Sequence, residues 1–147
     1  MNLRFSPAVA EDAEIILELN RQLIHRYEDL EAIDYRSVMN WVAQNIRDNL
    51  PCFRRIFWED QLAGYYCLTE TKEGAELDSF FILPQYRCRG IGTEVLRHII
   101  DTCNRSIFLY VFRRNSGAIA LYRRMGFTVT KEIGKTRYIM TYQKQDC

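Results

Sequence analysis

Polar and apolar residues repeat along this chain with two different periods. Apolar residues recur every three or four positions in four segments, which predicts amphipathic helices over 10–27, 35–49, 90–104 and 115–125. Shorter runs rich in aromatic and β-branched residues predict strands at 2–6, 52–58, 62–69, 75–83, 106–112, 127–133 and 137–142. The second helix should place Val38, Trp41, Val42 and Ile46 on its apolar face.

The predicted elements follow each other in the order β-α-α-β-β-β-α-β-α-β-β. Short turns at 59–61 and 70–74 predict antiparallel hairpins between consecutive strands. The helix between strands 75–83 and 106–112 instead predicts a crossover that joins a parallel pair. Since 106–112 is apolar on both faces, we expect it to be buried. The fold class is α/β, with a mixed central sheet and helices on both faces.

Composition narrows the class of protein. The 147 residues suit one domain spanning 1–147, and a hydrophobic share of 48% is enough for a sizeable core. A net charge of +1 argues against nucleic acid or a membrane surface as a partner. No segment resembles a membrane span or a signal peptide. Five widely spaced cysteines contain no Cys-x-x-Cys pair, so we expect no zinc site and a cytoplasmic protein with reduced thiols.

A basic loop with two glycines follows the strand 75–83. Residues 87–92 read Arg-Cys-Arg-Gly-Ile-Gly, and a helix begins directly afterwards. A helix N-terminus directs free backbone N–H groups and a positive dipole end at one point, and glycine lets a ligand approach the backbone. The loop is therefore expected to bind a phosphate or pyrophosphate. The lysine of a P-loop and the third glycine of a dinucleotide fingerprint are both absent.

A second motif lies at 115–127, which reads Asn-Ser-Gly-Ala-Ile-Ala-Leu-Tyr-Arg-Arg-Met-Gly-Phe. Asn115 is suited to cap a helix, and Gly126 stands where a helix end needs a left-handed residue. The pair of motifs, Arg-x-x-Gly-x-Gly followed by Asn-x-x-Ala-x-x-Leu-Tyr-x-x-x-Gly-Phe, resembles the GNAT superfamily of N-acetyltransferases. The resemblance covers nearly the whole chain and is strongest over 78–127.

The resemblance implies the GNAT fold, in which the parallel strand pair splays apart. It also implies acetyl-coenzyme A as co-substrate, without a metal. The loop would hold the pyrophosphate, and the pantetheine arm would pair with the open edge of the strand before it. The positions that would bind the cofactor are Phe81, Ile82, Leu83, Arg87, Cys88, Arg89, Gly90, Ile91, Gly92, Thr93, Asn115, Ala118 and Tyr122.

The reaction implied by the resemblance is direct attack of an amine on the thioester in a ternary complex. Tyr122 corresponds to the family's usual general acid, and a strand N–H near Phe81 would stabilise the oxyanion. Relatives often carry their base near the position of Ser79. Strand alternation places Glu76 and Asp78 on one face and Ser79 on the other. Asp78 is our first choice for the base; a solvated strand carboxylate or a water chain is the alternative.

The expected acceptor is a primary amine of a small molecule. The acidic residues Glu28, Asp29 and Glu31 would attract a cationic amine, although such a cluster also suits a solvated loop. A protein or peptide N-acetyltransferase and a non-catalytic acyl-CoA-binding sensor are the alternatives, and a loop that binds ATP is a third, weaker one. Either a monomer or a homodimer is compatible with the sequence.

Overall fold

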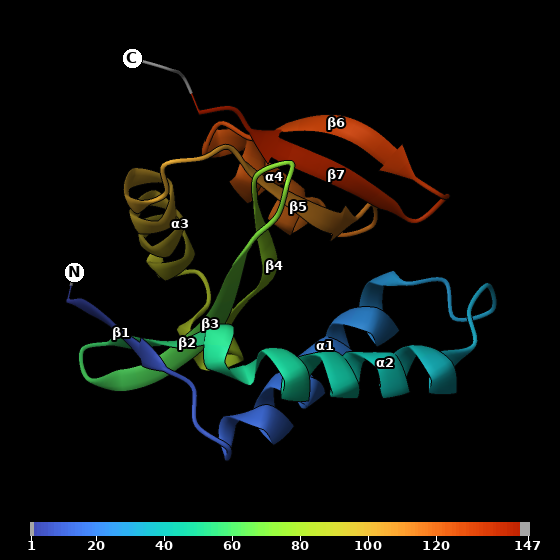
Figure 1. The fold of residues 1–147 in the computed structure, drawn as a ribbon, viewed down its shortest axis with the longest axis horizontal. Coiled ribbons are helices and arrows are strands. Elements are labelled where there is room, and N and C mark those ends of the chain that lie inside the picture. The colour runs from blue at the N-terminus through green and yellow to red at the C-terminus, as the bar shows by residue number, and fades with distance from the viewer. Residues whose placement is uncertain (1, 145–147) are drawn as a thin grey trace.

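A seven-stranded sheet is the centre of the computed structural model, which describes residues 2–144 (Figure 1). The strand order is β1-β2-β3-β4-β5-β7-β6. β4 and β5 form a parallel pair, and all other neighbours are antiparallel. The mixed sheet and the order of elements are those predicted from the sequence.

The helices and strands begin and end close to the predicted positions. The strands are β1 (Leu3–Pro7), β2 (Phe53–Trp58), β3 (Gln61–Glu70), β4 (Ala75–Ile82), β5 (Ile107–Phe112), β6 (Thr128–Ile133) and β7 (Arg137–Tyr142). The helices are α1 (Asp12–Tyr27), α2 (Tyr35–Asn49), α3 (Ile91–Thr102) and α4 (Ser116–Arg124). Two short 3-10 helices, η1 (Leu50–Cys52) and η2 (Pro84–Tyr86), were not predicted.

Two hydrophobic cores lie on opposite faces of the sheet. On one face, α3 and α4 pack against the sheet through buried residues such as Val95, Leu96 and Ile119. On the other face, α1 and α2 bury Ile16 and Val42 against the strands. Each pair of helices therefore covers one face of the sheet with its apolar stripes. Helices on both faces of the sheet were expected.

Local signals explain where two helices begin. The side chain of Asp34 accepts a 3.2 Å hydrogen bond from the backbone N–H of Ser37 and caps α2. Asn115 accepts a 3.2 Å bond from the N–H of Ala118 and caps α4, as predicted. Gly126 follows α4 with a φ of 101°, which glycine adopts without the steric cost of a side chain. The caps fix the bounds of the helices next to the candidate site.

Two aromatic residues predicted to be buried are exposed instead. Trp41 on α2 is 67% exposed, and Tyr110 on β5 is 44% exposed. β5 has one buried face, formed by its odd-numbered residues, because α3 and α4 cover only that side. The opposite side at Tyr110 is left uncovered. The prediction that 106–112 is buried on both faces is therefore wrong.

Candidate functional site

The parallel strands β4 and β5 separate after a short pairing. Their ladder consists of Ala75 opposite Ile107 and Glu76 opposite Phe108. Beyond this point β4 pairs only with β3, and β5 pairs only with β7. The edges that face each other therefore carry backbone groups without a strand partner, and such an edge accepts an extended ligand. The expected splayed pair is present.

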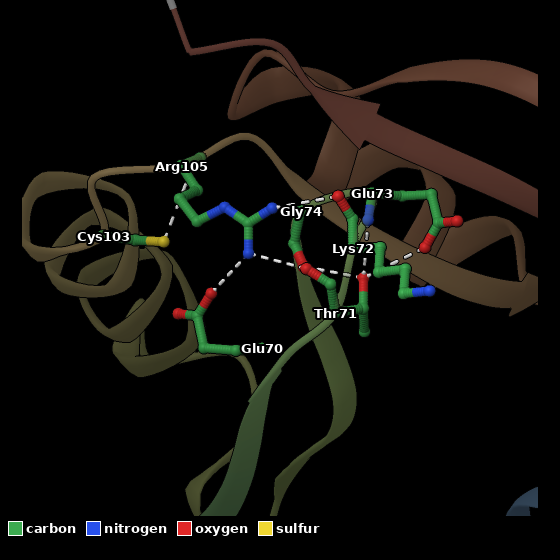
Figure 2. A network of polar contacts seen from close by, with 7 residues as sticks. All are labelled: Glu70, Thr71, Lys72, Glu73, Gly74, Cys103 and Arg105. Carbon is green, nitrogen blue, oxygen red and sulfur yellow. Dashed lines mark hydrogen bonds and ion pairs between the residues drawn. The ribbon is translucent and has the colours of Figure 1, made fainter.

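Arg105 ties together the closed end of this wedge, as Figure 2 shows. Its Nη1 donates to the carboxylate of Glu70 at 2.8 Å and to the carbonyl oxygen of Thr71 at 2.7 Å. Its Nη2 donates to the carbonyl oxygen of Lys72 at 3.2 Å. The residue that precedes β5 by two positions thus holds the turn between β3 and β4.

The backbones at this closed end lie unusually close together. The N–H of Ala75 donates a 2.9 Å hydrogen bond to the carbonyl oxygen of Ser106. At Gly74, which has a φ of 148°, an added Cβ would lie 2.7 Å from that same oxygen. A side chain there would force the two segments apart, so glycine permits the contact. The contact and the Arg105 bonds together define the apex of the wedge.

A cleft of about 910 Å³ opens between the separated strands and extends to α1 and α2. This volume lies in the range of sites that bind small molecules. β4 contributes 76–81 to its wall, β5 contributes 109–112, and α2 contributes Val38, Trp41 and Asn45 among others. α4 contributes Asn115, Ala118 and Tyr122. The cleft therefore gathers residues from both halves of the sheet and from both motifs.

A β-bulge at Asp78 changes which residues face the cleft. Cys67 of β3 lies opposite Ser79 of β4, but the next residue, Leu68, lies opposite Leu77. Asp78 is therefore an extra residue without a partner on β3. The strict alternation of the strand is interrupted at this position.

The bulge overturns one prediction about the strand. Before it, Leu77 packs into the core under α3; after it, Phe81 packs into the core under α1 and α2, although both numbers are odd. The bulge puts Ser79 on the face of Glu76 and Phe81. Glu76, Asp78 and Ser79 all line the cleft with the rest of 76–81. The expectation that Ser79 lies on the other face is wrong, because it assumed an unbroken alternation.

Carboxylates dominate the charge of the cleft wall. Burial and the neighbouring charge of Asp78 raise the pKa of Glu76 above its ordinary value. The amide of Asn45 on α2 donates a hydrogen bond of 3.5 Å to the Asp78 carboxylate. Glu28 also lines the cleft. Within the described part of the chain, Arg137 is the one Lys or Arg side chain among the lining residues.

Tyr122 lies on α4 with 9% of its surface exposed, and it borders the cleft. Its ring packs against Phe127 with 5.6 Å between the ring centres. Burial raises the pKa of the phenol, so the hydroxyl keeps its proton at neutral pH. Within residues 2–144, no side-chain hydrogen bond engages this hydroxyl, which is therefore available as a donor.

The loop before α3 presents a row of free backbone donors. Cys88 and Gly90 both have left-handed backbones, with φ of 64° and 79°. The first bonded amide of the helix is that of Glu94, which donates to the carbonyl oxygen of Gly90 at 3.2 Å. Within the described residues, the backbone N–H groups of residues 88–93 donate to no backbone carbonyl oxygen. This arrangement fits a pyrophosphate group.

The loop arginines are held in different ways. Arg87 donates from Nε to the carbonyl oxygen of Ile82 at 2.9 Å. The guanidinium of Arg89 lies 5.7 Å from the ring centre of Trp58 and 5.7 Å from that of Tyr86. Both side chains are exposed, and both add positive charge beside the free N–H groups. An anionic ligand is favoured here.

The remaining predicted positions differ in what they can offer a ligand. The side chain of Ile91 is buried in the core, so only its backbone N–H faces the loop. The N–H of Leu83 already donates to the carbonyl oxygen of Ala63 at 2.7 Å. Ile82 and Phe81 lie on β4, and Phe81 borders the cleft.

The acidic connection between the first two helices contributes less than expected. Glu28 reaches the cleft, whereas Asp29 and Glu31 do not line it. The carboxylate of Asp29 accepts a 3.1 Å bond from the N–H of Glu31 and shapes the turn. Trp41 and Arg137, which the sequence reading did not assign to the site, do line the cleft. No sequence motif includes Trp41 or Arg137, so nothing in the sequence indicated that either residue belongs to the site.

Two kinds of feature are absent from residues 2–144. No group of three or more His, Cys, Asp or Glu side chains is arranged to hold a metal ion. No helix there has the length and apolar character needed to cross a membrane.

Comparison with known proteins gives consistent matches. The model of the acetyltransferase (GNAT) family matches residues 13–127. The peptidyl-lysine N-acetyltransferase YjaB of Salmonella typhimurium is 26% identical over 120 residues, covering 82% of this chain and 79% of that protein. The spermine/spermidine N(1)-acetyltransferase of Bacillus subtilis is 38% identical over 92 residues, covering 53% of this chain and 60% of its own length.

The fold also matches solved structures. The PaiA N-acetyltransferase of Thermoplasma acidophilum, solved in complex with coenzyme A, superposes with a TM-score of 0.76 at 21% identity. The match covers 98% of this chain and 100% of the other.

Proposed function

Because this chain belongs to the acetyltransferase (GNAT) family and is an N-acetyltransferase that works with acetyl-coenzyme A, we propose that its acceptor is the primary amine of a small molecule. The amine attacks the thioester directly while both substrates are bound. One observation carries the proposal: the wedge between β4 and β5 opens into a cleft lined by carboxylates, and β4 leads from that cleft into the loop of free N–H groups.

The chain's own backbone does most of the cofactor binding in this proposal. The N–H groups of 88–93 hold the pyrophosphate, with charge from Arg87 and Arg89. The unpaired edge of β4 over 77–82 pairs with the pantetheine arm. Asn115 uses its side-chain oxygen to cap α4, which leaves its amide N–H groups to donate to the arm. Ala118 is small and leaves room beside it.

The bound cofactor supplies an activated acetyl group, and the chain lowers the barrier in three ways. Holding both reactants in one cleft removes part of the entropic cost, up to roughly 7–11 kcal/mol in ideal cases. A backbone N–H near Phe81 stabilises the developing negative charge, an effect of about 3 kcal/mol per donor in other enzymes. Tyr122 remains protonated and donates to the departing sulfur.

Asp78 is the proposed base, and Glu76 is its neighbour. Asp78 lines the cleft at the bulge, and the amide of Asn45 lies 3.5 Å from its carboxylate. Two neighbouring carboxylates attract an ammonium group, because its positive charge offsets their repulsion. The proton that the ammonium group releases is then accepted by the pair, whose two carboxylates titrate together. The raised pKa of Glu76 brings it closer to the pH at which a base works best.

A lysine side chain of a protein is the second candidate acceptor. The Salmonella relative is named for peptidyl-lysine, and the lysine ε-amine has the same reactive group as a small primary amine. A small-molecule amine is favoured here because the cleft of about 910 Å³ has to accommodate the cofactor arm as well as the acceptor.

Thiol release tests the proposal. The purified protein is given acetyl-coenzyme A together with phenethylamine, spermidine or a lysine-containing peptide, and free coenzyme A is measured. We expect release with at least one small amine that exceeds release with the peptide. Tight binding of acetyl-coenzyme A by calorimetry without release for any acceptor would instead identify a sensor. Faster release with the peptide would support the second candidate.

A further inference from the structure

The inner end of the acceptor region carries negative charge. Glu76 and Asp78 both face the cleft from β4, and the amide of Asn45 reaches the Asp78 carboxylate. Two carboxylates that share a partly buried wall repel each other, and an ammonium group relieves that repulsion. This end of the cleft therefore fits the amino group of a substrate.

An exposed indole lies one helical turn from Asn45, the residue that reaches the Asp78 carboxylate. Trp41 and Asn45 are four positions apart on α2, so they share a face, and both line the cleft. One turn of helix rises about 5.4 Å, which a short alkyl linker spans. A tryptophan with 67% of its surface exposed beside a cleft is a ready contact for a flat apolar group.

A tyrosine and an arginine lie on the β5 and β7 side of the same cleft. Tyr110 is 44% exposed, and the guanidinium of Arg137 lies 5.3 Å from the centre of its ring. Arg137 forms no ion pair with a residue that the structure describes. Its charge repels a second ammonium group, which is how a site rejects an unwanted substrate.

We propose that the acceptor is an arylalkylamine, a primary amine with one positive charge and a flat apolar body. Its ammonium group binds at Glu76 and Asp78, and its body contacts Trp41 and Tyr110. A polyamine is disfavoured on the β5 and β7 side of the cleft, where its additional ammonium groups meet the charge of Arg137; Glu28 is the one further carboxylate among the described lining residues. This inference rests on the proposed function, since it names the acceptor of that reaction.

Calorimetry with protein saturated with coenzyme A separates binding from turnover. Phenethylamine is the probe, and spermidine is the polycationic comparison. We expect phenethylamine to bind at least tenfold more tightly than spermidine. Trp41→Ala should weaken phenethylamine binding at least fivefold and change spermidine binding less than twofold, while Trp41→Phe should restore most of the loss. Val9→Ala, which truncates an exposed apolar residue away from the cleft, should change neither.

Arg137→Gln provides the complementary test. Removing the charge should tighten spermidine binding at least fivefold and change phenethylamine binding less than twofold. The inference is overturned if spermidine binds wild-type protein as tightly as phenethylamine does, or if Trp41→Ala weakens both ligands equally. Selective phenethylamine binding without thiol release from acetyl-coenzyme A would overturn the proposed function and leave this acceptor site supported.

Discussion

The hydroxyl of Tyr65 on β3 donates a hydrogen bond of 2.7 Å to the carboxylate of Asp12 at the start of α1. Asp12 is only 4% exposed, and it also accepts a 2.7 Å bond from the N–H of Val9. Nε of Arg55 lies 3.7 Å from the same carboxylate. These contacts of Asp12 join α1 to β3 and β2, on the face of the sheet that α1 and α2 cover.

Tyr65→Phe should lower the free energy of unfolding by about 1–3 kcal/mol, because the buried carboxylate of Asp12 loses a donor. Urea denaturation measures the change. Tyr27→Phe is the matched control, since no side-chain hydrogen bond of its hydroxyl is found in residues 2–144. Equal stability of the two variants would show that the Tyr65 bond adds nothing.

Gly90→Ala should weaken acetyl-coenzyme A binding. Gly90 has a left-handed backbone, and a side chain in that conformation costs roughly 1–2 kcal/mol, so the loop would relax and misalign its N–H groups. We expect a loss of affinity of about tenfold by calorimetry. Gly117→Ala is the control, because an added Cβ there meets no atom within 4 Å. Unchanged affinity in Gly90→Ala would argue against pyrophosphate binding at this loop.

Tyr122→Phe should reduce kcat on the order of 10²-fold, the low end of the contribution of a general acid. The ring still packs against Phe127, so stability and the affinity for acetyl-coenzyme A should stay near the wild-type values. Single-turnover kinetics and calorimetry measure the two quantities. A variant that turns over at the wild-type rate would remove Tyr122 from the mechanism.

The titration of Glu76 predicts a pH dependence of stability. Its pKa is raised in the folded protein, so the protonated form is favoured by folding. The stabilisation is present below the pKa of the unfolded chain and is lost as pH rises through the raised value. Glu76→Gln has no carboxyl group to titrate, so its stability relative to wild type should rise as the pH increases from the ordinary pKa of a glutamate through the raised one. The free energy of unfolding of both proteins is measured by urea denaturation at each pH. The same pH dependence in the two proteins would contradict a raised pKa of Glu76.

Periodicity alone predicted most of the fold. The bounds of α2 and β7 were predicted correctly because their apolar residues repeat without interruption and clear breakers flank them. The bulge at Asp78 could not be recognised from the sequence. One inserted residue reverses which side chains point to each face of a strand, but it does not change the residue types that predict the strand. The loop proposed to bind the cofactor was recognisable because its backbone conformation depends on glycine, which the sequence shows directly.

The proposed acceptor side of the cleft was harder to predict. Trp41 fits the apolar stripe of its helix, and only the absence of a covering neighbour reveals that it faces a cleft. Arg137 is one of many arginines, and its place beside Tyr110 depends on the pairing of β5 with β7. Such residues come together through the tertiary fold and carry no local pattern.

The hydrogen bonds of Arg105 lie at the apex of the wedge (Figure 2). There the sheet divides into two halves, β1–β4 and β5–β7. Among the described residues, only two pairs of the β4–β5 ladder join the two halves. A small rotation of one half about the apex would therefore produce a larger displacement at the open ends of β4 and β5. The end of β3 at Glu70 and the turn that follows it are the places where Arg105 supports the junction of the two halves. Substitution of Arg105 would remove three hydrogen bonds that supplement this short ladder, without touching any ligand.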